Sequence, residues 1–272
     1  MAMELPQSEP VPGGIAVIRI GAVEDTIKPR VHYTKKPVML VQHNRLWYAI
    51  IGIPLDTPAG NQTLEINTDQ QTRTLQFAVK AKAYEAQYLT IKNKRKVNPE
   101  KRDLKRITIE SRRMRKSFNH FDETIKLNKL HFSLPVEGII SSQFGLRRYF
   151  NKQPRRPHSG LDIAADIGTA IHAPLAGKIT ELGDFFFNGN TVMIDHGQGL
   201  ISMYCHMNKI AVVNGQHISQ GDIIGSVGMT GRVTGPHLHW SISLNNTRID
   251  PILLLDQPAL LAISAKNKTQ EE

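Results

Sequence analysis

Short hydrophobic runs, several of which alternate with polar residues, recur along the first 92 positions of the chain. In 64–66 and 74–79 the alternation has period two, which places every second side chain on one face of a β-strand. Turn residues such as Gly52 and Pro54 separate neighbouring runs. The runs lie at 15–20, 38–41, 46–51, 64–66, 74–79 and 84–91. The pattern predicts a sandwich-like all-β module over 14–92, preceded by a loose, proline-rich tail over 1–13.

The spacing of apolar residues becomes helical after this module. Asn98-Pro99-Glu100 is typical of a helix start, with a capping side chain, a proline in the first turn and an acid near the positive end. Residues spaced three and four apart then form one stripe along a helix of about seven turns. The stripe consists of Leu104, Ile107, Ser111, Met114, Phe118, Phe121 and Ile125. We expect a linker helix over 93–127 that docks this stripe on one of two domains.

Glycine content distinguishes the second half of the chain. Five glycines lie in 1–130 and the other fifteen lie in 138–235, where they separate short strand-like runs. The runs lie at 177–180, 191–194, 200–206, 210–213, 222–227 and 237–244. The sequence therefore predicts a mainly β protein with a C-terminal antiparallel domain over 128–256. We expect 257–272 to be a polar tail that frays, apart from a short apolar turn at 260–263.

The net charge of +10 arises mainly from one segment. Residues 92–116 hold twelve Lys or Arg against three acids. Nucleic-acid binding would account for this charge, but no aromatic residues are interspersed among the basic ones and no base-reading module accompanies them. Most of these side chains fall on the solvated faces of the predicted helix, so we expect no nucleic-acid partner. No run of eighteen apolar residues occurs, so we also predict no transmembrane segment.

A histidine pair stands at the start of the last strand-like run. His237 and His239 are two apart, so they project together from a strand, with Leu238 and Trp240 on the opposite, buried face. Many such pairs are structural, and the pair alone is weak evidence for a metal. Either both imidazoles bind a metal, or one binds it while the other transfers protons.

A second pair of candidate ligands lies upstream. His158 and Asp162 are four residues apart with Gly160 between them, a spacing that keeps them on one face. Together with the strand pair they supply the two imidazoles and one carboxylate that catalytic zinc takes, with an open position for water. The helix motif H-E-x-x-H is absent, so the base must come from elsewhere. His206 and the member of the strand pair that binds no metal are the candidates.

Strict alternation over 201–206 places Tyr204 and His206 on one face of a strand, with Met203 and Cys205 on the other. If His206 faces the metal, Cys205 does not. We therefore interpret Cys205 as a buried, small apolar residue. As it is the single cysteine, the chain has no internal disulfide.

From about 138 to 255 the sequence resembles the lysostaphin-type zinc endopeptidases, the LytM-like domain. The matching segments, in the expected order, are Ser142-Gln143-Phe144-Gly145-Leu146-Arg147, His158-Ser159-Gly160-Leu161-Asp162, Ala173-Pro174-Leu175-Ala176-Gly177, Gly189-Asn190-Thr191-Val192, Ile194-Asp195-His196-Gly197, Tyr204-Cys205-His206-Met207, Gly225-Ser226-Val227-Gly228-Met229-Thr230-Gly231 and Gly235-Pro236-His237-Leu238-His239. The run from about 138 to 255 that contains them covers more than a third of the chain. Cys205 and Met207 depart from the small or aliphatic residue and the leucine that more often flank the catalytic histidine.

The resemblance implies that His158, Asp162 and His239 bind one Zn²⁺ per chain, and that His206 and His237 are the catalytic histidines. It implies a zinc endopeptidase that cuts the peptide cross-links of bacterial peptidoglycan. Two alternatives remain open: a non-enzymatic regulator of cell-wall amidases, and a protease acting on glycine-rich proteins. Arg147 and Arg148 either grip a substrate carboxylate or lie in a solvated loop.

The start of the β module resembles a module found before this domain in exported Gram-negative members. The matching residues are Val11-Pro12-Gly13-Gly14-Ile15-Ala16-Val17. This favours a meso-diaminopimelate cross-link as substrate over a glycine bridge.

The N-terminus lacks the basic start and apolar core of a signal peptide. We interpret the chain as a mature periplasmic or secreted form whose signal was removed. A further hypothesis is that the N-terminal module folds over the groove and occludes the site.

Overall fold

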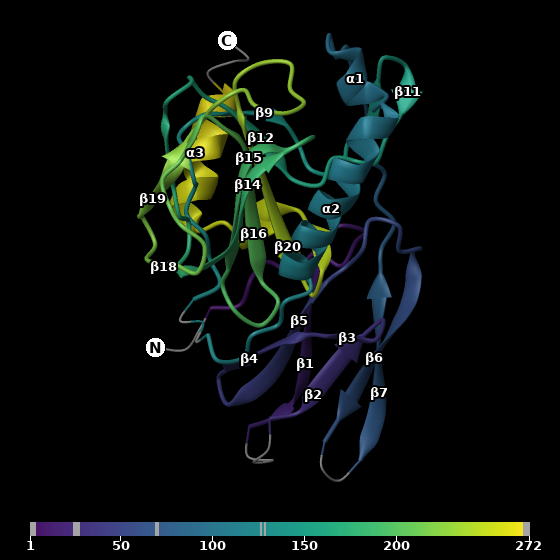
Figure 1. Cartoon of the computed structure of the whole chain (residues 1–272). Coiled ribbons are helices and arrows are strands. Elements are labelled where there is room, and N and C mark those ends of the chain that lie inside the picture. Colours follow the sequence, from purple (N-terminus) through teal and green to yellow (C-terminus); the bar gives the residue numbers. More distant parts are fainter. Residues whose placement is uncertain (1–3, 24–27, 69–70, 126, 128, 269–272) are drawn as a thin grey trace.

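The protein, seen in a computed structural model, is described over residues 4–23, 28–68, 71–125, 127 and 129–268. The N-terminal strands occupy the lower part of Figure 1, and the later strands, in green and yellow, occupy the upper part. The helix α2 lies along one side of the upper part (Figure 1). Within the described residues, no helix is both long and apolar enough to span a membrane.

The N-terminal module consists of two antiparallel sheets that share one core. The first has the strand order β1-β5-β4 and the second β3-β2-β6-β7. Alternation positions the core residues: in β6, Leu64 and Ile66 are buried while Glu65 between them is exposed. The strands are β1 (Ile15–Ala22), β2 (Arg30–Tyr33), β3 (Lys36–Pro37), β4 (Met39–His43), β5 (Leu46–Gly52), β6 (Gly60–Asn67) and β7 (Thr72–Val79). Their inner faces meet in one hydrophobic cluster, so the predicted sandwich-like architecture is confirmed.

Part of the predicted N-terminal tail is ordered against this module. Glu9 bridges to Ile15, and Val11 is buried. The hydroxyl of Tyr84 donates to the carbonyl of Pro12 at 2.7 Å. The prediction of a loose tail is therefore wrong for these residues, because hydrogen bonds from later segments to the carbonyls of Pro10 and Pro12 hold them in place. Residues 1–3 of that tail lie outside the described residues.

The last strand predicted for the N-terminal module belongs to a different sheet. The strand β8 (Ala86–Leu89) pairs in parallel with β10 (Arg147–Phe150), which also pairs with β11 (Gln153–Pro154). The chain that leaves the first module is thus hydrogen-bonded to the second before the helices begin.

The predicted linker helix is shorter than expected and is interrupted. A single-turn helix α1 (Lys94–Val97) precedes α2 (Lys101–Phe118), whose N-cap is Glu100 in a capping box with Asp103. The residues 119–125 are not helical, so the predicted extension to 127 is wrong. Of the stripe residues on α2, those at its C-terminal end pack as expected: Met114 and Phe118 join a buried cluster, but Leu104 is 51% exposed.

Polar side chains dock the middle of α2. Glu110 is buried and accepts hydrogen bonds from the backbone N–H of Phe186 and from Arg106. Arg113 pairs with Glu181 on the neighbouring strand. The helix is therefore held on the sheet by charge-assisted hydrogen bonds as well as by its apolar end.

The C-terminal part is built on an antiparallel sheet with the order β18-β14-β15-β16-β20-β12-β9, to which β21 adds beside β20. A smaller sheet has the order β13-β19-β17. The strands are β9 (Ile139–Ser142), β12 (Leu161–Ala164), β13 (Ala170–His172), β14 (Gly177–Phe185), β15 (Gly189–Asp195), β16 (Ile201–Met207), β17 (Lys209–Ile210), β18 (His217–Ile218), β19 (Ile223–Ser226), β20 (Leu238–Leu244) and β21 (Thr247–Ile249). Trp240 and Tyr204 face one side of the central sheet, where they join the main core.

The chain end is a helix, in contrast to the predicted fraying tail. A short 3₁₀ turn, η1 (Pro251–Leu254), leads into α3 (Gln257–Lys268). Asp256 accepts a hydrogen bond from the backbone N–H of Ala259, and Ala259 is buried in the main core. Half of the residues of α3 are Ala, Leu or Ile, and one buried face suffices to dock the helix although the segment ends in polar residues. Residues 269–272 lie outside the described residues.

The two β-rich parts are joined directly as well as through β8. The side-chain amide of Asn245 accepts from the N–H of Gly52 at 2.7 Å and donates to its carbonyl at 3.2 Å. Nearby, the N–H of Asp250 donates to the carbonyl of Gly13 at 2.9 Å. Buried backbone groups at the end of β5 are thereby satisfied by the other part of the chain.

Candidate metal centre and groove

Two adjacent strands bring Asp162 and His239 together. The strands β12 and β20 are antiparallel, and Asp162 lies directly opposite His239 in their register. Cross-strand partners project to the same face of a sheet, so the carboxylate and the imidazole meet. Gly160 permits this close approach, because a Cβ there would lie 2.3 Å from the carbonyl oxygen of Trp240.

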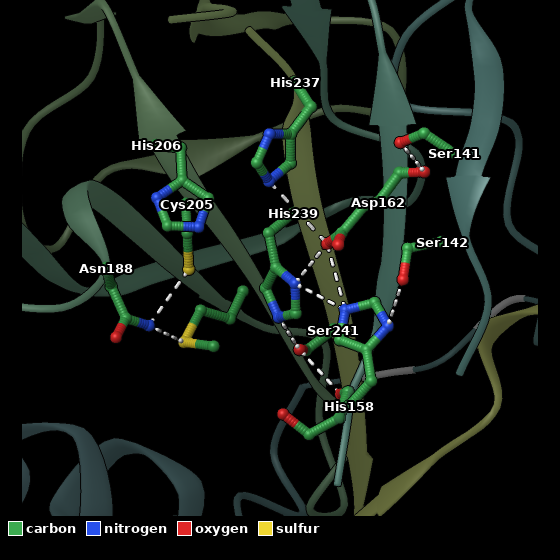
Figure 2. A network of polar contacts seen from close by, with 12 residues as sticks. Ser141, Ser142, His158, Asp162, Asn188, Cys205, His206, His237, His239 and Ser241 are labelled. Atoms are coloured by element: carbon green, nitrogen blue, oxygen red, sulfur yellow. Dashed lines mark hydrogen bonds and ion pairs between the residues drawn. The ribbon is translucent and has the colours of Figure 1, made fainter. Parts of the chain in front are cut away.

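His158 reaches the same point from the loop before β12. Its backbone N–H donates to Leu146 and its carbonyl accepts from Gly145, both at 2.8 Å. The Nε2 atom of His158 lies 3.0 Å from Oδ1 of Asp162 and 3.0 Å from Nδ1 of His239, and the last two atoms are 2.7 Å apart (Figure 2). These three buried residues therefore direct one potential ligand atom each at a common centre.

Hydrogen bonds on the far sides of the two rings fix which nitrogen faces the centre. Nδ1 of His158 lies 2.6 Å from the carbonyl oxygen of Gln143, so it carries the proton and Nε2 is left with a lone pair. Nε2 of His239 lies 2.9 Å from Oγ of Ser241, which donates its own proton to the carbonyl of Ser159. Nε2 of His239 is thus the donor, and Nδ1 has the free lone pair.

Two lone pairs and a carboxylate oxygen this close together repel one another unless a cation lies between them. Burial alone would raise the pKa of Asp162, but the imidazoles of His158 and His239 hold that pKa well below its usual range. Burial lowers the pKa of His239 to about 4. Arg148 donates to the other oxygen, Oδ2, of Asp162 and so leaves Oδ1 turned to the centre. The donor set fits a divalent metal with nitrogen and oxygen ligands.

Two further imidazoles stand beside this centre. Nδ1 of His237 lies 2.9 Å from the carbonyl of Gly235, and Nδ1 of His206 lies 2.8 Å from the carbonyl of Thr230. Each ring therefore presents an unprotonated Nε2, and that of His237 is 3.8 Å from Oδ1 of Asp162. The two ring centroids are 4.9 Å apart. Burial, with the neighbouring His237 and His239, holds the pKa of His206 well below its usual value.

The structure corrects the predicted alternation around His206. Tyr204 lies opposite Trp240 and faces the core, whereas Cys205 lies opposite His239 and shares its face. The register between β15 and β16 shifts here, and His206 adopts a φ of +64°. This irregularity returns His206 to the face that Cys205 already occupies, and a β-bulge is known to redirect a side chain in this way. Cys205 is fully buried, as expected.

The centre opens into a groove of about 510 Å³ between α2 and the sheet face. Its lining residues are Ile107, Ser111, Met114, Arg148, Phe150, Arg155, Arg156, Pro157, His158, Ser159, Phe187, Asn188, Met203, His206, Arg232 and His239. The structure thus brings together all five residues singled out from the sequence (Figure 2): Asp162 contacts His158 and His239, and His237 lies beside Asp162 and His206.

Several residues of this site were not predicted from the sequence. Ser241 and the carbonyl of Gln143 orient the two histidines, but their roles follow only from the fold. Arg148 lies neither in a solvated loop nor free for a ligand, because it pairs with Asp162. For Ser241, the period-two alternation with His237 and His239 was the signal that could have indicated its place on the same face.

Comparison with known proteins agrees with this geometry. Residues 156–251 match Peptidase family M23, and residues 8–82 match the Peptidase family M23 N-terminal domain. A putative peptidase M23 from Pseudomonas aeruginosa, known from a crystal structure, is 41% identical. The match covers 91% of this chain and 95% of that one, with a TM-score of 0.75.

Two bacterial relatives match a part of this chain. The DD-carboxypeptidase/endopeptidase Mpg of Neisseria meningitidis is 40% identical over 113 residues, which are 42% of this chain and 26% of Mpg. The peptidoglycan DD-endopeptidase ShyA of Vibrio cholerae is 42% identical over 104 residues, 38% of this chain and 24% of ShyA. The chain thus spans about a quarter of the length of these relatives. With both M23 segments present, and the Pseudomonas protein matched along nearly its whole length, this chain belongs to the M23 peptidase family.

Proposed function

We propose that this chain is a zinc-dependent endopeptidase that hydrolyses the peptide cross-links of bacterial peptidoglycan. The observation that carries the proposal is the convergence of Nε2 of His158, Nδ1 of His239 and Oδ1 of Asp162 on one centre. Two imidazoles and a carboxylate are a ligand set of catalytic zinc sites, which keep a further position open for water. We assign one Zn²⁺ to these three residues.

When bound, zinc would lower the pKa of a coordinated water to roughly 7 and so supply a nucleophile at neutral pH. His206 and His237 stand where they can take up a proton, since each presents an unprotonated Nε2 whose ring is fixed by a backbone carbonyl. Once protonated, either ring donates a hydrogen bond to the negative charge that develops on the attacked carbonyl oxygen.

The relatives support the choice of substrate. ShyA is named a peptidoglycan DD-endopeptidase, and Mpg a DD-carboxypeptidase/endopeptidase. We extend this substrate class to the present chain, with the meso-diaminopimelate type of cross-link as the expected target. Because peptidoglycan lies outside the cytoplasm, a periplasmic or secreted location follows from the same proposal.

Digestion of purified sacculi tests the function. Sacculi treated with the zinc-loaded chain and then with a muramidase should yield uncross-linked muropeptides in place of cross-linked ones, and a His239→Ala variant should leave the cross-linked ones unchanged. Products cut between glycan and peptide only in the presence of an amidase would instead indicate a regulator. Cleavage of glycine-rich proteins by a chain that leaves sacculi intact would indicate a protease that acts on such proteins.

We also propose that the segment before the catalytic part restricts access to the groove. Ile107, Ser111 and Met114 of α2 line it, and Gln87 of β8 bonds both Arg148 and Ser142. The substitution Arg113→Ala removes the ion pair to Glu181 and so weakens the contact between α2 and the sheet. If α2 restricts access, this variant should have a higher cleavage rate. An unchanged rate in a variant with looser α2, as measured by hydrogen exchange, would contradict occlusion.

A further inference from the structure

The groove is lined by arginines that have few acidic partners. Arg148, Arg155, Arg156 and Arg232 line it, and none of its lining residues is acidic. Arg148 pairs with Asp162. Within the described part of the chain, Arg155, Arg156 and Arg232 form no ion pair. This arrangement concentrates positive charge beside the candidate metal centre.

Arg232 is the most firmly positioned of these side chains. Its guanidinium lies between two aromatic rings, 4.4 Å from the centroid of Phe187 and 4.7 Å from that of Phe150. Its backbone N–H donates to the carbonyl of Phe187, which fixes the start of the side chain. Of the guanidinium nitrogens, only Nη1 has a hydrogen bond among the described residues, a long one of 3.4 Å to the carbonyl of Lys96. A planar cation is thus held rigidly with most of its donors unused.

The neighbouring charges make an anionic ligand favourable. Burial, with Arg148 and Arg155 nearby, lowers the pKa of Arg232 to about 10, so the group remains charged at neutral pH. Arg155 is itself fixed, since Nη2 donates to the carbonyl of Val97 and to Oε1 of Gln153. Holding like charges close together is unfavourable unless an anion binds between them. A carboxylate matches the fork of donors that a guanidinium presents.

We propose that Arg232, with Arg155 beside it, forms a carboxylate-binding subsite, and that the groove therefore selects peptides with a free carboxylate near the scissile bond. The subsite lies in the same groove as His206 and His239, so a peptide that reaches those histidines also reaches the arginines. The inference rests on the proposed function only in taking the ligand to be a peptide.

The test uses three cross-linked peptides that differ only in their carboxylates. The first has a free carboxylate on the residue beside the scissile bond, the second has an amide there, and the third has an amide at its C-terminus instead. We expect the full zinc-loaded chain to prefer the first peptide over one of the amides by roughly tenfold to a hundredfold in kcat/KM. The amide peptide with the lower kcat/KM identifies the carboxylate that Arg232 binds.

Substitution then assigns the preference to the side chain. Arg232→Gln should reduce the acid-to-amide ratio to about one, and Arg232→Lys should restore part of it, because a lysine keeps the charge without the fork. Arg112→Gln is the matched control, since Arg112 is exposed on α2 and does not line the groove. A ratio in Arg232→Gln equal to that of the parent chain would overturn the inference.

A binding measurement separates this inference from the proposed function. Calorimetry with the product peptide and its amide reports the subsite without any cleavage. Tighter binding of the acid that is lost in Arg232→Gln supports the subsite even if no peptide is cut, in which case the proposed function fails and the subsite stands. Equal binding of acid and amide by the parent chain, together with equal cleavage, refutes the subsite alone.

Discussion

Oγ of Ser241 lies 2.9 Å from Nε2 of His239 and donates its own hydrogen to the carbonyl of Ser159 at 2.8 Å. The hydroxyl can therefore only accept from the ring, and it holds His239 with Nδ1 toward the proposed metal. Such partners behind a ligand tune both its orientation and its basicity.

Ser241→Ala should weaken zinc affinity by roughly tenfold to a hundredfold, because the ring of His239 loses the acceptor that fixes its tautomer. Competition with a fluorescent chelator measures this. Ser243→Ala is the control: it lies two residues further along the same face of β20, but its hydroxyl bonds Arg248. Equal affinities for the two variants would remove Ser241 from this role.

A variant of a proposed ligand histidine and a variant of a proposed catalytic histidine should differ in metal content. His158→Ala should lose the metal, since it removes one of three ligand atoms at the common centre. His237→Ala should keep the metal and lose cleavage by roughly a hundredfold to ten-thousandfold, the range for a general acid or base. Metal content and cleavage rate are measured on the same samples. Loss of zinc from His237→Ala would place that residue among the ligands instead.

A different histidine should make stability depend on pH. Burial lowers the pKa of His196 to about 4 in the folded chain, from 6.5 in the unfolded chain. Between these values the unfolded state binds the proton and the folded state does not. The stabilisation is therefore complete above pH 6.5 and is lost as the pH falls toward about 4, by about 3 kcal/mol in all.

Urea unfolding of the metal-free chain at several pH values measures this loss. His196→Asn should remove that part of the pH dependence, while Nδ2 of asparagine can still donate to the carbonyl of Ala176 that Nδ1 of His196 now bonds. The same slope in both proteins would assign the acid sensitivity to other groups.

Cys205 should be unreactive while the chain is folded. Burial raises the pKa of its thiol to about 12, and the amide of Asn188 donates to the sulfur at 3.1 Å. A thiol-specific reagent at pH 8 should therefore label it only at the rate of unfolding, because both the thiolate and access are absent in the folded state. Rapid labelling without denaturant would contradict this burial.

The structure brings together the site residues proposed from the sequence, for reasons that lie in the strand geometry. Asp162 and His239 are cross-strand partners, and regular strands carry their side chains at predictable positions. His206 was a candidate base from the residues alone and a catalytic histidine by resemblance, although the alternation used to place it was wrong. The β-bulge that redirects His206 arises from the register shift between β15 and β16. The residue pattern of β16 alone does not predict that shift.

Long-range polar contacts were likewise not predicted from the sequence. Glu110 is buried and accepts a hydrogen bond from the backbone N–H of Phe186, a distant residue that no pattern within the helix indicates. Arg232 gave no signal either, since its two aromatic neighbours come from strand and loop segments far away in the chain. Both cases require knowledge of which segments meet.

The reciprocal amide bonds between Asn245 and Gly52 have a consequence for thermal behaviour. They join the end of β5 to the turn after β20, so melting of either half removes the partners of a buried polar group in the other half, the backbone of Gly52 or the side-chain amide of Asn245. A calorimeter should accordingly record one cooperative heat-absorption peak for the whole chain, rather than one peak for each half.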